Sequence, residues 1–291
     1  MKELIALLLA AVMLGTSTGT ADEASPEPET PEAVQESEKS FLDADRLDED
    51  VREILKKAGA KEENVSVALK FPETGETYYF NADRWLYTAS LCKLPVAMTY
   101  AHKLKTGELE KKKGKSGDTY ALEKILVNSS YSYYSNIAKK IYGKVNTQEE
   151  KAQALAYSGL DEDLVPEDYL TSQRYSARFF LGIVEELYEN SEEYPEVIDK
   201  MKKASPVTYF RLKIRKKYPV AQKYGSDRDV VHAAGIIYTD CPILLVVMTT
   251  GKDDSVGNRV IGNIADYFAA EATEWSAACI PPVEEDTEAA S

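Results

Sequence analysis

Ser90-Leu91-Cys92-Lys93 lies where a predicted strand hairpin ends and a predicted helix begins, and the elements on either side of it decide the fold. Before it, residues 65–69 and 77–80 read as strands that flank Glu73-Thr74-Gly75-Glu76, a hairpin signature with the glycine in the turn. After it, apolar residues recur at helical spacing: Leu94, Ala97, Met98, Ala101 and Leu104. The stretch therefore joins a sheet to a helical region.

The rest of the chain extends this pattern in both directions. Residues 43–57 form an amphipathic pattern that closes near Gly59, and residues 94–217 read as helices and loops. Three β-rich runs then return, followed by a last helical pattern: 220–224, 230–238, 243–249 and 255–275. This order predicts an α/β fold of the α+β sandwich kind, in which an antiparallel sheet from both ends of the chain is covered by the terminal helices and an all-helical lobe is inserted between.

The two ends of the chain have a different composition from the middle. Residues 1–21 read as a signal peptide, with an apolar run from Leu4 to Gly15 that is shorter than the about 20 residues needed to span a bilayer. An uncleaved membrane anchor is the alternative. Residues 22–40 and 281–291 are acidic and poor in large apolar residues, which indicates a disordered linker and tail. We therefore expect one domain at residues 41–280, secreted or held in the cell envelope.

The net charge and the numbers of cysteine and histidine residues limit which partners and metals the protein can bind. The 291 residues include 49 acidic and 35 basic side chains, for a formal net charge of −14, which leaves no overall positive field to hold nucleic acid. The 3 cysteines and 2 histidines are scattered, so a zinc cluster is disfavoured. The sequence predicts no metal and no nucleic-acid partner.

Ser90 and Lys93 are the first candidate catalytic residues. Residues at i and i+3 of a helix share a face, so the Lys93 amine can reach the Ser90 hydroxyl. A partly buried lysine with a lowered pKa can take the proton that makes serine a nucleophile, and a helix N-terminus offers free N–H groups to a developing oxyanion. The alternative is structural: Ser90 as an N-cap and Lys93 as a solvated residue of the first turn.

Two further stretches carry candidate residues. Residues 128–136 are rich in hydroxyls and open a helix within the predicted helical lobe, where a loop with an N-cap is the structural alternative. Lys223-Tyr224-Gly225-Ser226 lies on a predicted strand, where a lysine could line one edge of a cleft. A lysine that protects an edge strand against aggregation is the alternative there.

Taken together, these stretches resemble the motifs of class A serine β-lactamases and the related penicillin-binding D,D-peptidases, which carry S-x-x-K, S-x-N and K-[TS]-G in this order. The matching residues are Ser90 to Lys93, Ser130 to Ser132, and Lys223 to Gly225. Asn136 follows Ser130 by six positions, as an asparagine often does in the family. Tyr134-Ser135-Asn136 is a competing match to the middle motif.

A literal K-T-G stands elsewhere in the chain, at Lys105-Thr106-Gly107. It lies on the same predicted helix as Ser90 and about 22 Å further along it, too far to share a site. We interpret it as a helix end with a glycine cap.

The resemblance implies a role for each residue. Ser90 would be the nucleophile, Lys93 its general base and Ser130 the relay that gives a proton to the leaving nitrogen. Ser132, Lys223, Tyr224 and Gly225 would bind substrate, with Lys223 facing the substrate carboxylate, and the backbone N–H groups of Ser90 and Ser226 would form the oxyanion hole. Such acyl transfer needs no cofactor, and the implied substrate is a β-lactam or a small peptidoglycan-peptide-like compound. We expect a monomer.

The sequence also departs from the family. Ser132 lacks the amide of the S-x-N asparagine, and Tyr224 replaces a small hydroxyl residue that helps to hold the substrate carboxylate, so substrate affinity should suffer. Class A enzymes use a loop glutamate to activate the deacylating water. Only Glu162 and Glu167 are candidates here, on a short loop, and without such a base the acyl-enzyme would turn over slowly.

Two smaller predictions concern residues outside these motifs. His232 stands between apolar residues of a predicted strand and reads as a core or rim histidine. A strand of about 30 Å and a returning helix of about 33 Å would let Cys241 and Cys279 meet in a disulfide, with Cys92 left as a buried thiol.

Two functions from different classes follow. The first is an exported serine hydrolase that forms an acyl-Ser90 intermediate on a β-lactam or an acyl-D-Ala-like amide. The second, motivated by Ser132 and Tyr224, is a catalytically degenerate domain that keeps the cleft to bind cell-wall material or a partner. A peptidase or esterase without affinity for β-lactams is a further form of the first.

Overall fold

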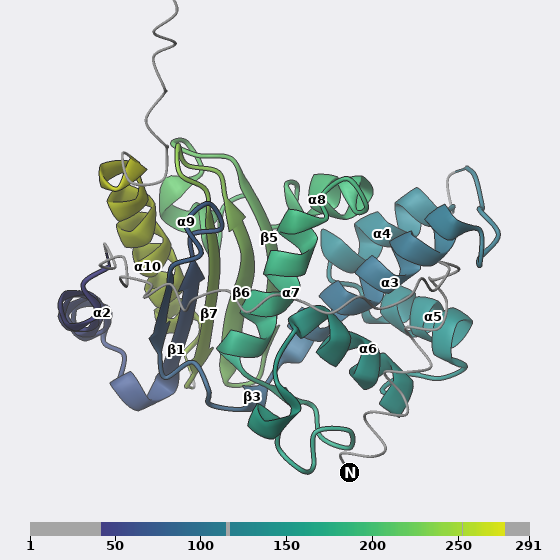
Figure 1. Cartoon of the computed structure of the whole chain (residues 1–291), viewed down its shortest axis with the longest axis horizontal. Coiled ribbons are helices and arrows are strands. Elements are labelled where there is room, and N and C mark those ends of the chain that lie inside the picture. Colours follow the sequence, from purple (N-terminus) through teal and green to yellow (C-terminus); the bar gives the residue numbers. More distant parts are fainter. Residues whose placement is uncertain (1–41, 115–116, 252, 277–291) are drawn as a thin grey trace, which may run out of the picture.

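The computed structural model describes residues 42–114, 117–251 and 253–276. Its centre is a five-stranded antiparallel sheet in the order β2-β1-β7-β6-β5, built from both ends of the chain (Figure 1). The strands are β1 (Val65–Lys70), β2 (Thr77–Phe80), β5 (Val220–Asp227), β6 (Val230–Ile237) and β7 (Ile243–Thr250). The predicted order of elements along the chain and the antiparallel sheet are confirmed. The expected signal peptide, linker and tail lie outside the described residues.

Helices from the two ends of the chain cover one face of the sheet. They are α2 (Ala44–Ala58) and α10 (Asp254–Glu274), which pack side by side. Helix α2 begins at the cap Asp43, which accepts the N–H of Arg46 at 3.1 Å, and ends at Gly59 with φ of 75°, a left-handed conformation that glycine adopts without strain. Apolar residues on this face form one core cluster that includes Leu47, Phe268 and Val247.

The opposite face of the sheet meets the helical lobe through α7 (Ala177–Glu189), which packs on β1, β6 and β7. The remaining helices of the inserted region are α3 (Lys93–Thr106), α4 (Asp118–Leu126), α5 (Tyr131–Tyr142), α6 (Gln148–Ser158), α8 (Pro195–Met201) and α9 (Arg211–Ile214). Figure 1 shows α3 to α6 grouped beside the β5 edge of the sheet. The inserted region is helical as predicted except for β4 (Arg174–Tyr175), which pairs with β3 (Leu86–Tyr87) just before the insertion.

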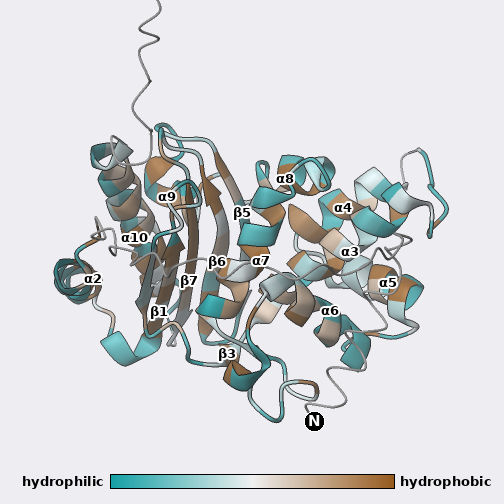
Figure 2. Cartoon of the chain, in the orientation of Figure 1, coloured by the Kyte–Doolittle hydropathy of each residue, from teal (hydrophilic) through white to brown (hydrophobic). Residues whose placement is uncertain are grey.

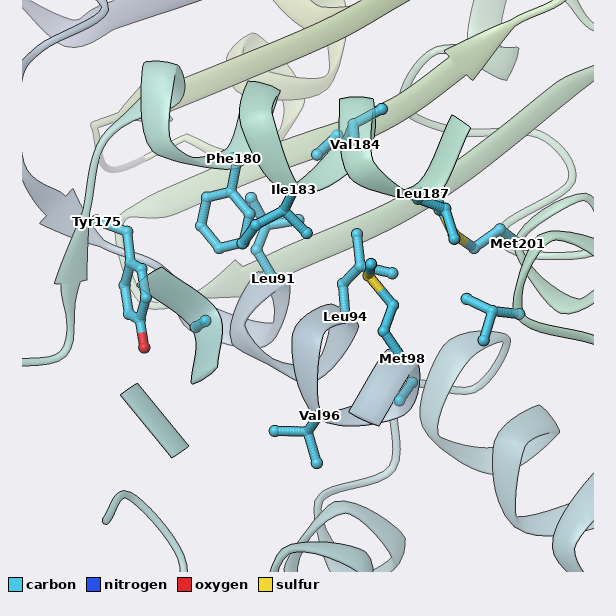
Figure 3. Close-up of a cluster of buried hydrophobic side chains, with 14 of the residues drawn as sticks. Leu91, Leu94, Val96, Met98, Tyr175, Phe180, Ile183, Val184, Leu187 and Met201 are labelled. Carbon is cyan, nitrogen blue, oxygen red and sulfur yellow. The ribbon is translucent and has the colours of Figure 1, made fainter. Parts of the chain in front are cut away.

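A second apolar cluster joins the lobe to the sheet. Leu91, in the turn just before α3, and Leu94, in the first turn of α3, point toward Phe180 and Ile183 of α7 (Figure 3). Each of these four side chains is buried, so their packing fixes where the N-terminus of α3 lies. The hydropathy view shows the same division, with hydrophobic colours along the strands and hydrophilic colours on the outer helix faces (Figure 2). None of the helices among the described residues is both long and apolar enough to cross a bilayer.

Candidate active site

Ser90 and Lys93 meet at the start of α3. Ser90 lies in a short 3₁₀ turn, Ala89–Cys92, that leads directly into α3, and the Lys93 Nζ lies 2.8 Å from the Ser90 Oγ. The Lys93 side chain is only 5% exposed. Burial lowers its pKa because the charged form loses solvation. The predicted pair is therefore in hydrogen-bond contact, and its amine is shifted toward the neutral form that can accept a proton.

Two strands hold the segment that precedes Ser90. The Nδ1 of His232 on β6 accepts the N–H of Thr249 at 3.1 Å, so its Nε2 carries the proton and donates to the carbonyl oxygen of Tyr87 at 2.8 Å. Burial lowers the pKa of His232 to about 4, which keeps the ring neutral. His232 is thus the buried, hydrogen-bonded histidine that the sequence predicts.

Gly225 on β5 brings the sheet edge against the same segment. A Cβ atom at Gly225 would lie 2.9 Å from the backbone nitrogen of Ser90 and 3.0 Å from the carbonyl oxygen of Thr88. These distances are shorter than normal contacts with backbone atoms, so a larger residue would push β5 away from Ser90. The close approach of β5 to the turn depends on glycine.

The hydroxyl that lies between the two site lysines belongs to Ser129. Its Oγ accepts a hydrogen bond from Lys223 Nζ at 3.0 Å and lies 3.4 Å from Lys93 Nζ. Lys93 Nζ also donates to the carbonyl oxygen of Ser129 at 2.5 Å. Ser129 therefore connects a lysine of the helical lobe to a lysine of the sheet.

The prediction that Ser130 has this position is wrong by one residue. The Ser130 side chain caps α5, accepting the N–H of Tyr133 at 3.5 Å, and its Oγ lies 3.1 Å from that of Ser132. Ser130 and Ser132 make no hydrogen bond with Lys93 or Lys223 among the described residues. Asn136, which favoured Ser130 in the sequence comparison, is exposed on α5.

The capping signal could have identified Ser129. A serine directly before a helical pattern uses its oxygen for the N–H groups of the first turn, as Ser130 does, and this leaves the preceding serine free to face another partner. Ser129 also has φ of 54°, and Ala89, which precedes Ser90, has φ of 48°. Such left-handed conformations cost non-glycine residues about 1–2 kcal/mol each. Both candidate serines therefore lie at or beside a strained backbone position.

Lys223 is fully buried in the site. Its side chain is 0% exposed, and burial, together with the positive charge of Lys93, lowers its pKa well below the usual lysine value. Besides Ser129, its Nζ donates to the carbonyl oxygen of Tyr224 at 2.5 Å and lies 4.5 Å from the centre of the Tyr224 ring. No carboxylate forms an ion pair with Lys93 or Lys223 in the described part of the chain.

Tyr224 and Ser226 continue the β5 edge beyond Lys223. The Tyr224 hydroxyl donates to the carbonyl oxygen of Val127 at 3.0 Å, so this side chain connects β5 to the loop before Ser129. Its ring stacks on that of Tyr209, with centroids 4.7 Å apart. The Ser226 hydroxyl donates to Oδ2 of Asp254 at 3.3 Å.

Neither glutamate predicted as a deacylation base contacts the site. Glu167 is exposed and Glu162 half-buried, and neither side chain bonds Ser90 or Lys93 within the described residues. Lys151 of α6 anchors the loop at residues 159–173 that carries both glutamates. Its side chain is 3% exposed, and its Nζ donates to the carbonyl oxygens of Tyr169 and Ser172. The loop therefore has a lysine anchor but brings no carboxylate to the candidate nucleophile.

The remaining sequence candidates have structural settings. Gly107 ends α3 with φ of 83°, and Lys105 pairs with Glu193 at 2.5 Å, so Lys105-Thr106-Gly107 is the helix end that we predicted. Cys92 is a free thiol, but it is half-buried and not fully buried as predicted; burial raises its pKa, and Cys241 is disulfide-bonded. Its predicted partner, Cys279, lies outside the described residues. Within residues 42–276, leaving aside the undescribed gaps, no three His, Cys, Asp or Glu side chains gather as a metal site.

Comparison with known proteins identifies the family of this chain. The model of the beta-lactamase enzyme family, Beta-lactamase2, matches residues 46–115 and 127–271, which is most of the chain. The protein therefore belongs to the beta-lactamase enzyme family, and the resemblance inferred from the motifs is confirmed. No curated protein matches the chain.

Solved structures show the same fold. A beta-lactamase from Chitinophaga pinensis is 18% identical, with a TM-score of 0.63 over 77% of this chain and 98% of its own. The TLA-3 extended-spectrum beta-lactamase is 14% identical, with a TM-score of 0.65 over 79% of this chain and 99% of its own. A beta-lactamase from Xanthomonas campestris is also 14% identical, with a TM-score of 0.63 and coverage of 78% and 97%.

Proposed function

We propose that this protein is an exported, monomeric serine hydrolase that works through an acyl-Ser90 intermediate. One observation carries the proposal: Lys93 Nζ lies 2.8 Å from Ser90 Oγ, in a site where the lysine is buried and no described carboxylate holds it in the charged form. A neutral amine at this distance can accept the hydroxyl proton as the serine attacks a carbonyl carbon.

The remaining contacts support a complete acylation step. The new Oγ–C bond forms as the Ser90 proton passes to Lys93 Nζ, and the backbone N–H groups of Ser90 and Ser226 receive the oxyanion. The bond to the leaving nitrogen or oxygen then breaks, and Ser129 gives that atom its proton. Lys93, 3.4 Å from the Ser129 Oγ, returns the proton to Ser129. This assignment replaces Ser130 by Ser129 in the relay.

The contacts that support acylation do not include a base for deacylation. Water must attack the acyl ester, and no described carboxylate bonds Ser90 or Lys93 to act as its base. We therefore propose that the acyl-enzyme accumulates and hydrolyses slowly. The acyl donor is an amide or ester, and the classes that the family implies are β-lactams and acyl-D-Ala-like amides.

Labelling of Ser90 tests the proposal. Incubating the full chain with a fluorophosphonate, which reacts with activated serines, should give a stoichiometric adduct by intact mass. Ser90→Ala should abolish the adduct, and Ser130→Ala serves as a matched control because, among the described residues, the Ser130 side chain hydrogen-bonds only with Ser132 and Tyr133 at the start of its own helix. A folded protein that forms no adduct would instead support the degenerate binding module.

A further inference from the structure

The groups beside the leaving-group position differ from those expected of a carboxylate subsite. This inference rests on the proposed function, in which a substrate lies along β5 between Ser90 and Ser129. Lys223 Nζ joins the Ser129 hydroxyl to the carbonyl oxygen of Tyr224, so whatever is attached to the leaving atom lies next to Tyr224. The chemistry around Tyr224 therefore selects the leaving group.

Lys223 is the cation nearest to that position, and it is enclosed. Its side chain has no exposed surface, its hydrogen bonds go to Ser129 and to the Tyr224 carbonyl, and the Tyr224 ring lies 4.5 Å from its Nζ. Two contacts fix the Tyr224 ring: its hydroxyl donates to the carbonyl oxygen of Val127, and its face stacks on the ring of Tyr209. An incoming carboxylate would have to displace this ring to reach the Lys223 Nζ.

The neighbours of Tyr224 on its own face of the sheet supply no substitute cation. Its cross-strand partner on β6 is Ala233, and partners in an antiparallel pair point to the same face. Two residues along β5, Ser226 is bonded to the carboxylate of Asp254. The next basic residue along the chain, Arg228, lies in the exposed turn after β5 and forms no ion pair within the described residues. Among the described residues, the charged group bonded to this face of β5 is therefore the Asp254 carboxylate.

We propose that the substrate of this site carries no carboxylate beside the bond that Ser90 attacks, and that Tyr224 and Asp254 exclude one. Tyr224 acts by covering Lys223, and Asp254 acts by repulsion between like charges. The substrate class is then a neutral or basic amide or ester, in contrast to penicillins and acyl-D-Ala compounds, which present a carboxylate at this point.

Two aryl esters with the same acyl group test the proposal directly. The 3-carboxyphenyl and 3-carbamoylphenyl esters of phenylacetic acid give the same acyl-Ser90 adduct, so only the leaving group differs. Adduct formation on the full chain is followed by intact mass, and each rate is divided by the rate of alkaline hydrolysis of that ester. The carbamoyl ester should acylate Ser90 about tenfold faster, since an uncompensated like charge costs about one tenfold step.

Single variants separate the two causes. Tyr224→Thr should raise the rate of the carboxy ester at any ionic strength, because it uncovers Lys223. Asp254→Asn should raise it mainly at low salt, because Asp254 is exposed and salt screens its charge. Glu274→Gln makes the same charge change at the other end of α10, about 30 Å away, and should leave the ratio unchanged.

The outcomes are distinguishable from failure of the proposed function. If the native protein reacts with the carboxy ester as fast as with the carbamoyl ester, the exclusion of carboxylates is wrong even though Ser90 is a nucleophile. If neither ester nor the fluorophosphonate modifies Ser90, the acyl-enzyme itself is wrong.

Discussion

The candidate active site and helix α6, which supports the loop at residues 159–173, each bury lysine side chains that form no ion pair among the described residues, yet the two regions use them differently. Lys151 donates to two backbone carbonyl oxygens, and the nearby charges of Glu150 and Asp168 oppose the lowering of its pKa by burial. Lys93 and Lys223 each donate to one backbone carbonyl oxygen but also contact the Ser129 hydroxyl, and Lys93 lowers the pKa of Lys223 further. Burial alone therefore does not make a lysine reactive. Its acceptors and its neighbouring charges decide whether it anchors a loop or moves a proton.

Replacing Lys93 and, separately, Lys151 by methionine should distinguish the lysine that moves a proton from the lysine that anchors a loop. We expect Lys93→Met to slow phosphonate labelling of Ser90 by about 10³-fold, since general-base catalysis contributes on this scale. Lys151→Met should change labelling by less than about twofold but lower the free energy of unfolding by roughly 1–3 kcal/mol, because two carbonyls lose their donor. Labelling kinetics and urea unfolding measure the two effects. Equal loss of labelling in both variants would contradict the distinction.

The adjacent serines Ser129 and Ser130 give a second, smaller contrast. Ser129→Ala should slow acylation by the carbamoyl ester by about 10²-fold, because the leaving group loses its proton donor. Ser130→Ala should leave that rate nearly unchanged and cost about 1 kcal/mol of stability through loss of the α5 cap. Intact-mass kinetics and thermal unfolding provide the measurements. If Ser130→Ala proves the more damaging to acylation, the relay belongs to Ser130 after all.

The buried Lys223 predicts a pH dependence of stability. Because its folded pKa lies well below 10.5, the unfolded chain binds more protons between the two pKa values, so its contribution to stability rises with pH across that interval. The unfolding free energy of the native protein minus that of Lys223→Met should therefore increase with pH, by at most about 1.4 kcal/mol per unit. Urea titrations of both proteins at several pH values measure it. A flat or falling difference would show that Lys223 stays charged in the fold.

Much of the fold followed from local sequence patterns. Glycine in the 73–76 turn, apolar runs at 230–238 and 243–249, and the order of elements specify the antiparallel sheet and its helical insertion. Within the region predicted as helices and loops, α7 begins only at Ala177, because Ser176 caps it and Arg174–Tyr175 pair with β3. This pairing depends on residues far apart in sequence, which a local pattern does not reveal.

For the candidate active site, too, local sequence predicts short-range contacts but not contacts between distant residues. The contact of Ser90 with Lys93 depends on one helical turn and was predicted from spacing. The choice between Ser129 and Ser130 depends on competition for an N-cap, and two adjacent serines look alike in sequence. The bridge from Tyr224 to Val127 joins residues 97 positions apart, so only the folded chain shows that the aromatic ring encloses Lys223.

The two left-handed residues at the site, Ala89 and Ser129, bear on how this protein should be engineered. Glycine at either position would remove the steric penalty yet widen the range of conformations open to the unfolded chain, so the net thermostability gained would be small. The same replacement would loosen the backbone that aims a reactive oxygen. Substitutions meant to raise thermostability should therefore leave Ala89 and Ser129 unchanged and start on the solvent-exposed faces of the helices.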